Sequence, residues 1–184
     1  MDHHYWTLIT YAWVHAVSLF GDPSLFWVHI GMNMFALWCL GPVLEDYLGH
    51  WRYLGLYFGG AIAAALFWWL VRANGGASQG IVGASGAIFA LVAGAGTAAP
   101  REVFDLGFLK LPHISLSLWA ISVAIIGLEV VQVIMASIPF IVRQPLFSGW
   151  LTQIAHTAHL GGALYGFLYV MLLRYLASRR TVHH

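Results

Sequence analysis

Residues 81–99, IVGASGAIFALVAGAGTAA, are the stretch that decides the fold, because they carry no charged side chain and are mostly small and apolar. A bilayer core about 30 Å thick is crossed by roughly 20 mostly apolar residues in a helix. We therefore expect this stretch to be a membrane span. Small residues recur along one face of that helix and allow a second helix to approach closely in lipid; they are Gly83, Ala87, Ala90 and Gly94.

Four further stretches have a similar apolar composition and are separated by short polar breaks. They are Phe26–Leu44, Tyr53–Val71, Ile114–Ile138 and Trp150–Leu176. Lipid offers no hydrogen-bond partner to a polypeptide backbone, so helices are the expected form of such spans. The sequence therefore predicts an all-α polytopic membrane helix bundle with five transmembrane helices, forming a single domain over residues 1–184.

The composition excludes several other classes of protein. Of the 184 residues, 60% are hydrophobic and 8% are charged, whereas a soluble domain carries about 25% charged residues. Eight Lys and Arg against seven Asp and Glu leave no basic surface for nucleic acid. The single cysteine, Cys39, excludes an internal disulfide. The expected surroundings are therefore a lipid bilayer, with no nucleic acid as partner.

The basic residues gather on one side of the membrane if the five spans alternate in direction. Those on the more basic side are Arg52, Arg101, Lys110, Arg174, Arg179 and Arg180, and those opposite are Arg72 and Arg143. The positive-inside rule then predicts an outer N-terminus and a cytoplasmic C-terminus. The expected location is the plasma (inner) membrane. Residues 1–25 are expected to form an outer interfacial segment, 26–176 the helix bundle and 177–184 a cytoplasmic tail.

Polar side chains, which are costly inside a bilayer, fall at the outer ends of three predicted spans. His29 and Asn33 are four residues apart at the start of the first span, so they share one helix face. Ser85 lies near the start of the third span, and His156 and His159 lie near the start of the fifth. The charge pattern therefore directs three polar helix starts to the same side of the membrane.

A second stripe of one helix face contains His159, Gly162 and Gly166. If this stripe packs against the small-residue stripe of residues 81–99, His159 comes within reach of Ser85. A serine beside an imidazole has the geometry of a nucleophile and its general base. Glu129 and Gln132, inside the fourth span, fit either a proton relay or a hydrogen bond between helices.

Three motifs, in this order on separate spans, make the sequence resemble the rhomboid family of intramembrane serine proteases. Residues 29–33, HIGMN, resemble the family's H-x-x-x-N, and residues 83–86, GASG, resemble its G-x-S-G. Residues 158–166, AHLGGALYG, resemble its A-H-x-x-G-x-x-x-G. The resemblance covers nearly the whole chain, although the first helix of the family's six-helix core has no counterpart here.

The resemblance implies a serine endopeptidase that cuts single-pass membrane proteins in or near their transmembrane helices, without a metal or other cofactor. Ser85 would be the nucleophile and His159 the general base, as a dyad with no carboxylate third member. His29, Asn33 and the backbone N–H of Ser85 would form the oxyanion hole. Supporting roles would fall to Gly83, Phe89, Gly162 and Gly166, with Phe89 where the family often has a tyrosine stacked on the histidine.

Two other functions remain open at the level of the sequence. One is a catalytically inactive rhomboid-like protein that binds transmembrane helices without cutting them. The other is a metal or haem site built from His29, His156 and His159, since imidazole suits zinc, copper and iron. The latter leaves Ser85 and Asn33 without a role. The oligomeric state is not predicted.

Overall fold

The computed structural model describes Thr10, Ala12 and residues 25–73, 83–105, 115–143 and 155–181. The predicted interfacial segment, residues 1–25, therefore lies outside the described residues except for Thr10, Ala12 and Leu25. Along the chain, the helices and strands are α2 (Leu25–Leu48), α3 (His50–Ala73), α4 (Ser85–Ala98), β1 (Val103–Asp105), β2 (Ser115–Ser117), α5 (Leu118–Ala136), α6 (Pro139–Val142) and α8 (His156–Thr181).

The predicted all-α membrane helix bundle is confirmed. By length and composition, four of the described helices can cross a membrane: α2, α3, α5 and α8. The helix α4 is shorter and also apolar. Helix α8 continues to Thr181, so the first residues of the predicted tail extend this helix.

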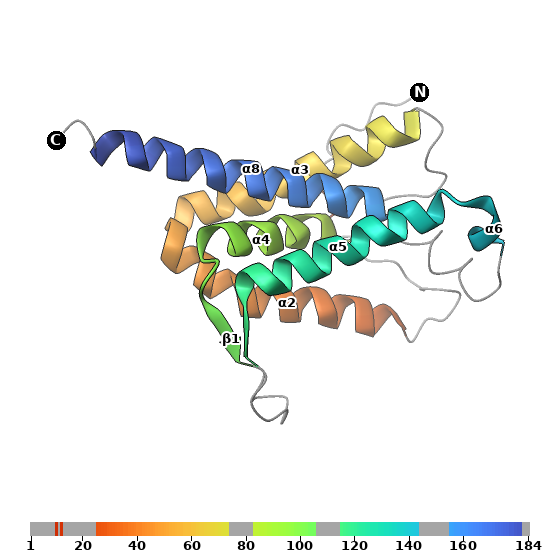
Figure 1. Ribbon diagram of the computed structural model, residues 1–184, viewed down its shortest axis with the longest axis horizontal. Helices are drawn as coiled ribbons and strands as arrows, with labels where there is room; N and C mark the ends of the chain where they lie inside the picture. Colours follow the sequence, from red (N-terminus) through yellow and green to blue (C-terminus); the bar gives the residue numbers. More distant parts are fainter. Residues whose placement is uncertain are drawn as a thin grey trace.

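Helix α4 forms the centre of the bundle. It packs against α8, α3, α2 and α5, and Figure 1 shows it with α8 along one side and α2 along the other. Its buried residues run almost without a break from Gly86 to Gly96. Because most of these residues are glycine or alanine, the neighbouring helices can approach the α4 backbone from several sides.

Of the third predicted span, Ile81–Ala99, the structure describes residues 83–99, and 14 of these are helical. Gly83 has a φ of +95°, which an α-helix of L-residues does not accommodate, so α4 begins after it at Ser85. Pro100 follows two residues after the last helical residue, Ala98, and disfavours continuation of the helix. At 1.5 Å per residue, α4 is about 21 Å long.

The bundle has a charged end and an opposite end, called here the Ser85 end, where α4 and α8 begin. At the charged end, Nδ1 of His50 lies 2.6 Å from Glu45 Oε1. The hydroxyl of Tyr47 donates to Glu102 Oε2 at 3.2 Å. Arg174 donates to the carbonyl oxygen of Thr97 at 2.7 Å. Ionisable side chains at this end therefore join α2, α3, α4 and α8.

A short β-hairpin, which the sequence analysis did not predict, connects α4 to α5 at the charged end. Strands β1 and β2 are antiparallel, with Phe104 opposite Leu116. The fourth predicted span, Ile114–Ile138, is therefore extended at its start and becomes helical at Leu118. The Ser117 side chain caps that helix by accepting a hydrogen bond from the backbone N–H of Ala120 at 3.2 Å, which satisfies one of the free donors of the first turn.

Candidate active site

Ser85 and His159 lie 74 positions apart in the sequence and meet at the Ser85 end of the bundle. Nε2 of His159 is 2.8 Å from the Oγ of Ser85, which is hydrogen-bond distance. Ser85 is the first residue of α4, and His159 lies in the first turn of α8. The contact expected from the two small-residue stripes is therefore present.

Two glycines allow α8 to lie close enough to α4 for this contact. A Cβ on Gly162 would overlap the carbonyl oxygen of Gly86, and one on Gly166 would overlap the carbonyl oxygen of Ala90. Both glycines therefore pack directly on the α4 backbone. Since Gly162 lies one turn after His159, this close approach sets the distance between the imidazole and Ser85.

The ring of Phe89 fixes the plane of the imidazole. Phe89 lies one turn after Ser85 on α4, and its ring is stacked on that of His159 with 4.3 Å between centroids and 6° between planes. Stacking of two rings restricts the imidazole to one orientation. The expectation that Phe89 covers the histidine is thus met in the geometry.

The turn before α4 lies against the two polar residues of α2. A Cβ on Gly83 would be 2.8 Å from Cε1 of His29 and 3.9 Å from Nδ2 of Asn33, so both side chains reach the loop that carries Ser85. Asn33 is 5% exposed, and its Nδ2 donates to no other described residue. A buried donor of this kind is suited to an oxygen atom of a ligand.

Glu129 of α5 lies between the two histidines of α8, an arrangement that the sequence analysis did not resolve. Its Oε2 is 2.7 Å from Nδ1 of His156, so the hydrogen bond between helices, one of the two interpretations of Glu129, is confirmed. Its Oε1 is 3.1 Å from Nδ1 of His159, within ion-pair distance, although that N–H is not aligned for a hydrogen bond. The expected Ser–His dyad therefore has a carboxylate beside it.

The same three residues could hold a metal ion by geometry. The ligand atoms of Glu129, His156 and His159 lie within 4.8 Å of one another. His29, which the sequence alternative included, is not part of this group and lies against Gly83. Because the nitrogen–oxygen distances of 2.7 and 3.1 Å are those of hydrogen-bonded and ion-paired groups, the cluster is explained without a metal.

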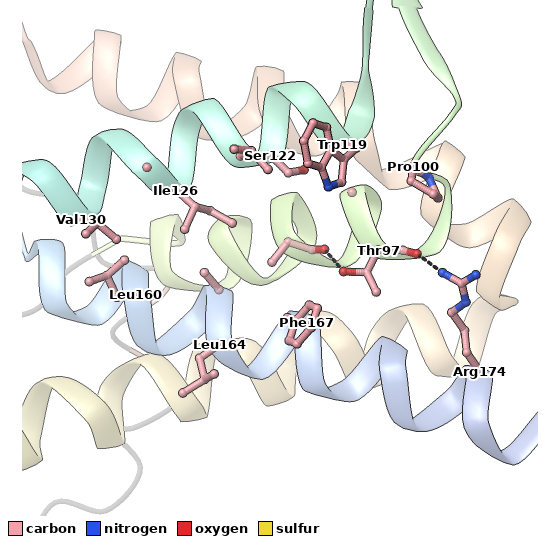
Figure 2. A pocket seen from close by; sticks show the side chains of 15 residues that line it. Thr97, Pro100, Trp119, Ser122, Ile126, Val130, Leu160, Leu164, Phe167 and Arg174 are labelled. Carbon is pink, nitrogen blue, oxygen red and sulfur yellow. Dashed lines mark hydrogen bonds between the residues drawn. The ribbon is translucent and has the colours of Figure 1, made fainter.

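A cavity of about 710 Å³ lies elsewhere in the bundle, between α4, α5 and α8. Figure 2 shows its mainly apolar wall, with Leu160 and Phe167 on α8, Ile126 on α5, and Arg174 bonded to Thr97 at one end. Of the site residues described above, none lines this cavity. It is therefore separate from the site around Ser85.

Comparison with known proteins gives one family match and several curated relatives. The rhomboid domain model matches residues 2–176. Presenilin-associated rhomboid-like protein A, mitochondrial, of Danio rerio is 29% identical over 143 residues, which are 78% of this chain and 33% of that protein. The human presenilin-associated rhomboid-like protein, mitochondrial, is 28% identical over 154 residues, which are 84% of this chain and 36% of that protein.

A yeast protein matches a shorter part of the chain. Rhomboid protein 1, mitochondrial, of Saccharomyces cerevisiae is 42% identical over 69 residues, which are 36% of this chain and 20% of that protein. The chain thus spans about a third of the length of the first curated relatives that it matches. No solved structure matches it.

Proposed function

The chain belongs to the rhomboid family, and from this premise we propose that it is an intramembrane serine endopeptidase. The observation that carries the proposal is the 2.8 Å contact between Ser85 Oγ and His159 Nε2. A base within hydrogen-bond reach of a serine hydroxyl is the geometric requirement for a nucleophile. Ser85 attacks the scissile carbonyl while His159 takes its proton, and His159 then gives that proton to the leaving amine.

The oxyanion of the tetrahedral intermediate is stabilised by donors around the start of α4. Ser85 begins this helix, and the first N–H groups of a helix have no partner within the helix. The amide of Asn33 and the ring of His29 approach the same turn from α2. Donors that are in place before the reaction stabilise the developing charge without reorganisation, and one such donor is worth about 2.7–4 kcal/mol.

The short length of α4 supports a recessed site that water can reach. A helix of 14 residues is about 21 Å long, so it leaves about 9 Å of a 30 Å hydrocarbon core uncrossed. Because the last residues of α4 lie next to the charged end, the part of the hydrocarbon core that α4 leaves uncrossed is at its first residue, Ser85. Hydrolysis needs water there, and the recess gives it a route from one membrane face.

The substrates that we propose are single-pass membrane proteins, cut in or near their membrane helices. The chain is a membrane protein, with several helices long enough to span. The expectation of a plasma-membrane location with a cytoplasmic C-terminus stays a prediction. It gains no support from the animal and yeast relatives, whose names describe them as mitochondrial.

Labelling with a fluorophosphonate serine probe tests the proposal. The wild-type protein in detergent or liposomes is expected to be labelled, and the variants Ser85→Ala and His159→Ala are expected to lose labelling. Both variants should also cleave a model membrane substrate at least about 10³-fold more slowly than the wild type. Ser122→Ala is the matched control, because Ser122 is a buried serine outside the site, and its Oγ donates to Val92 O at 2.6 Å. This variant should be labelled normally.

A folded wild-type protein that neither labels nor cleaves would contradict the proposal. It would leave the alternative of a rhomboid-like protein that binds transmembrane helices without cutting them.

A further inference from the structure

Glu129 approaches His159 at the ring nitrogen that does not face Ser85. We propose that Glu129 is a positioning residue for the general base and that His156 holds its carboxylate in place. The site then consists of four side chains in series, Ser85, His159, Glu129 and His156, instead of a dyad. This inference rests on the proposed protease function and goes beyond it, because it assigns a third and a fourth member to the catalytic group.

The two nitrogens of the His159 ring have different partners. Nε2 is 2.8 Å from Ser85 Oγ, and Nδ1 is 3.1 Å from Glu129 Oε1. To accept a proton from Ser85 at Nε2, the neutral ring must carry its own proton on Nδ1. A carboxylate next to Nδ1 favours this tautomer, and it stabilises the imidazolium that forms when the serine proton is taken.

The N–H of Nδ1 does not yet point along the line to Oε1. Catalytic hydrogen bonds of unliganded enzymes are often long or poorly aligned and tighten in the complex with substrate. Among the described residues, Nδ1 of His159 has no hydrogen-bond partner, and the Glu129 carboxylate is the acid within ion-pair distance of it. A small rotation of the ring or of the carboxylate completes the bond.

His156 fixes the position of the carboxylate from its other oxygen. Its Nδ1 lies 2.7 Å from Glu129 Oε2, and it precedes His159 by three residues on the same helix, so both rings lie on one face of α8. The side chains of His156 and Glu129 are 4% and 11% exposed. A buried carboxylate is costly unless it is paired and hydrogen-bonded. The pairing of both oxygens therefore explains how an acid is retained inside a membrane span.

A purely structural role for Glu129 would be to tie α5 to α8. Helix α5 already has a comparable tie to α4, in which Ser122 Oγ donates to Val92 O at 2.6 Å. Removing either tie loosens α5, but only Glu129 touches the general base. The comparison of Glu129→Gln with Ser122→Ala therefore separates positioning of the imidazole from packing of the helix.

The experiment measures kcat and KM for cleavage of a model transmembrane substrate by the full chain in liposomes, together with thermal unfolding. Glu129→Gln keeps the shape and removes the charge, and its kcat is expected to fall about 10²-fold or more with KM changed less than about twofold. Glu129→Asp keeps the negative charge, and its kcat should be at least tenfold higher than that of Glu129→Gln. Ser122→Ala should keep kcat even where its unfolding temperature falls.

Several results would overturn the inference. One is a Glu129→Gln variant with the kcat of wild type, and another is a loss of kcat in Ser122→Ala equal to that in Glu129→Gln. Activity that EDTA abolishes and zinc restores would assign Glu129, His156 and His159 to a metal site instead. If Glu129→Gln does not fold, His156→Gln replaces it, and an unchanged kcat in that variant contradicts the series. An inactive but folded wild-type protein is a different failure, since it removes the proposed function itself.

Discussion

A single backbone conformation, that of Gly83, joins the proposed oxyanion donors on α2 to the proposed nucleophile on α4. Its φ of +95° turns the chain into α4 at Ser85, and its missing side chain leaves room for His29. Both requirements favour glycine, because an L-residue at this φ is strained and its Cβ would press on the imidazole. One residue therefore sets both the start of the helix and the approach of the proposed oxyanion donors, His29 and Asn33.

Gly83→Ala is expected to lower activity strongly while the protein remains folded. The strained φ costs about 1–2 kcal/mol, and a Cβ 2.8 Å from Cε1 of His29 displaces this ring from the start of α4. We expect kcat to fall about tenfold or more. The matched control is Gly31→Ala on α2, where a Cβ meets no atom within 4 Å, and this variant should cleave like wild type. Equal rates for both variants, measured on a model membrane substrate, would contradict the role of Gly83.

At this scale, the sequence predicted the placement of side chains where a motif is local. The spacing of His29 and Asn33, and the GASG turn around Ser85, follow from helix geometry and from the need for a glycine turn. The place of Glu129 could not be predicted in the same way, because its contacts with His156 and His159 depend on how α5 is rotated against α8. The available signal was an acid inside a span, which indicates a functional group but does not identify its partner.

Among the contacts between helices, the packing of α8 on α4 brings Ser85 and His159 together. The two helices approach each other through Gly162 and Gly166, whose missing side chains admit the carbonyl oxygens of Gly86 and Ala90. On a neighbouring face of α8, hydroxyl groups of tyrosine tie it to α3, with Tyr165 donating to Gly55 O at 3.1 Å and Tyr169 to Arg52 O at 3.2 Å. Helix α8 is thus held from two directions.

Gly162→Ala should both destabilise the protein and slow cleavage. A methyl group at this position overlaps the Gly86 carbonyl, and forced overpacking typically costs about 1–3 kcal/mol. The displacement moves His159 away from Ser85. Both the rate of labelling by a serine probe and the unfolding temperature should therefore fall. Gly127→Ala on α5 is the control, because a Cβ there meets no atom within 4 Å. If Gly162→Ala labels as fast as this control, the close approach does not set the catalytic distance.

The sequence predicted which elements exist better than where they end. Apolar length located the five long helices among the described residues, α2, α3, α4, α5 and α8, since lipid requires helical spans. It did not predict that Ser115–Ser117 form a strand before the helix, because apolar strand and helix residues look alike over a few positions. Because of the cap at Ser117 and the pairing of β1 with β2, the helix starts later than hydropathy alone indicates.

In the molecule as a whole, the distribution of ionisable side chains along the bundle axis predicts which side of the membrane the candidate site faces. Glu45, His50, Arg101, Glu102 and Arg174 lie at the charged end, whereas Ser85 and His159 lie at the opposite end. A cavity of about 570 Å³ at the charged end includes Arg101 and Arg174 in its wall. The positive-inside rule therefore predicts that the Ser85 end faces outward.

This orientation can be measured with single cysteines in a Cys39→Ala background. Arg101→Cys lies at the charged end, and Phe140→Cys lies on α6, where the native side chain is 74% exposed. Because α5 starts beside Glu102 and leads to α6, position 140 belongs to the Ser85 end. In sealed vesicles of native orientation, an impermeant maleimide should label position 140 at once and position 101 only after the membrane is permeabilised. The reverse order would place the Ser85 end at the inner compartment, and the proposed substrates would then have to present their cleavage sites from that side.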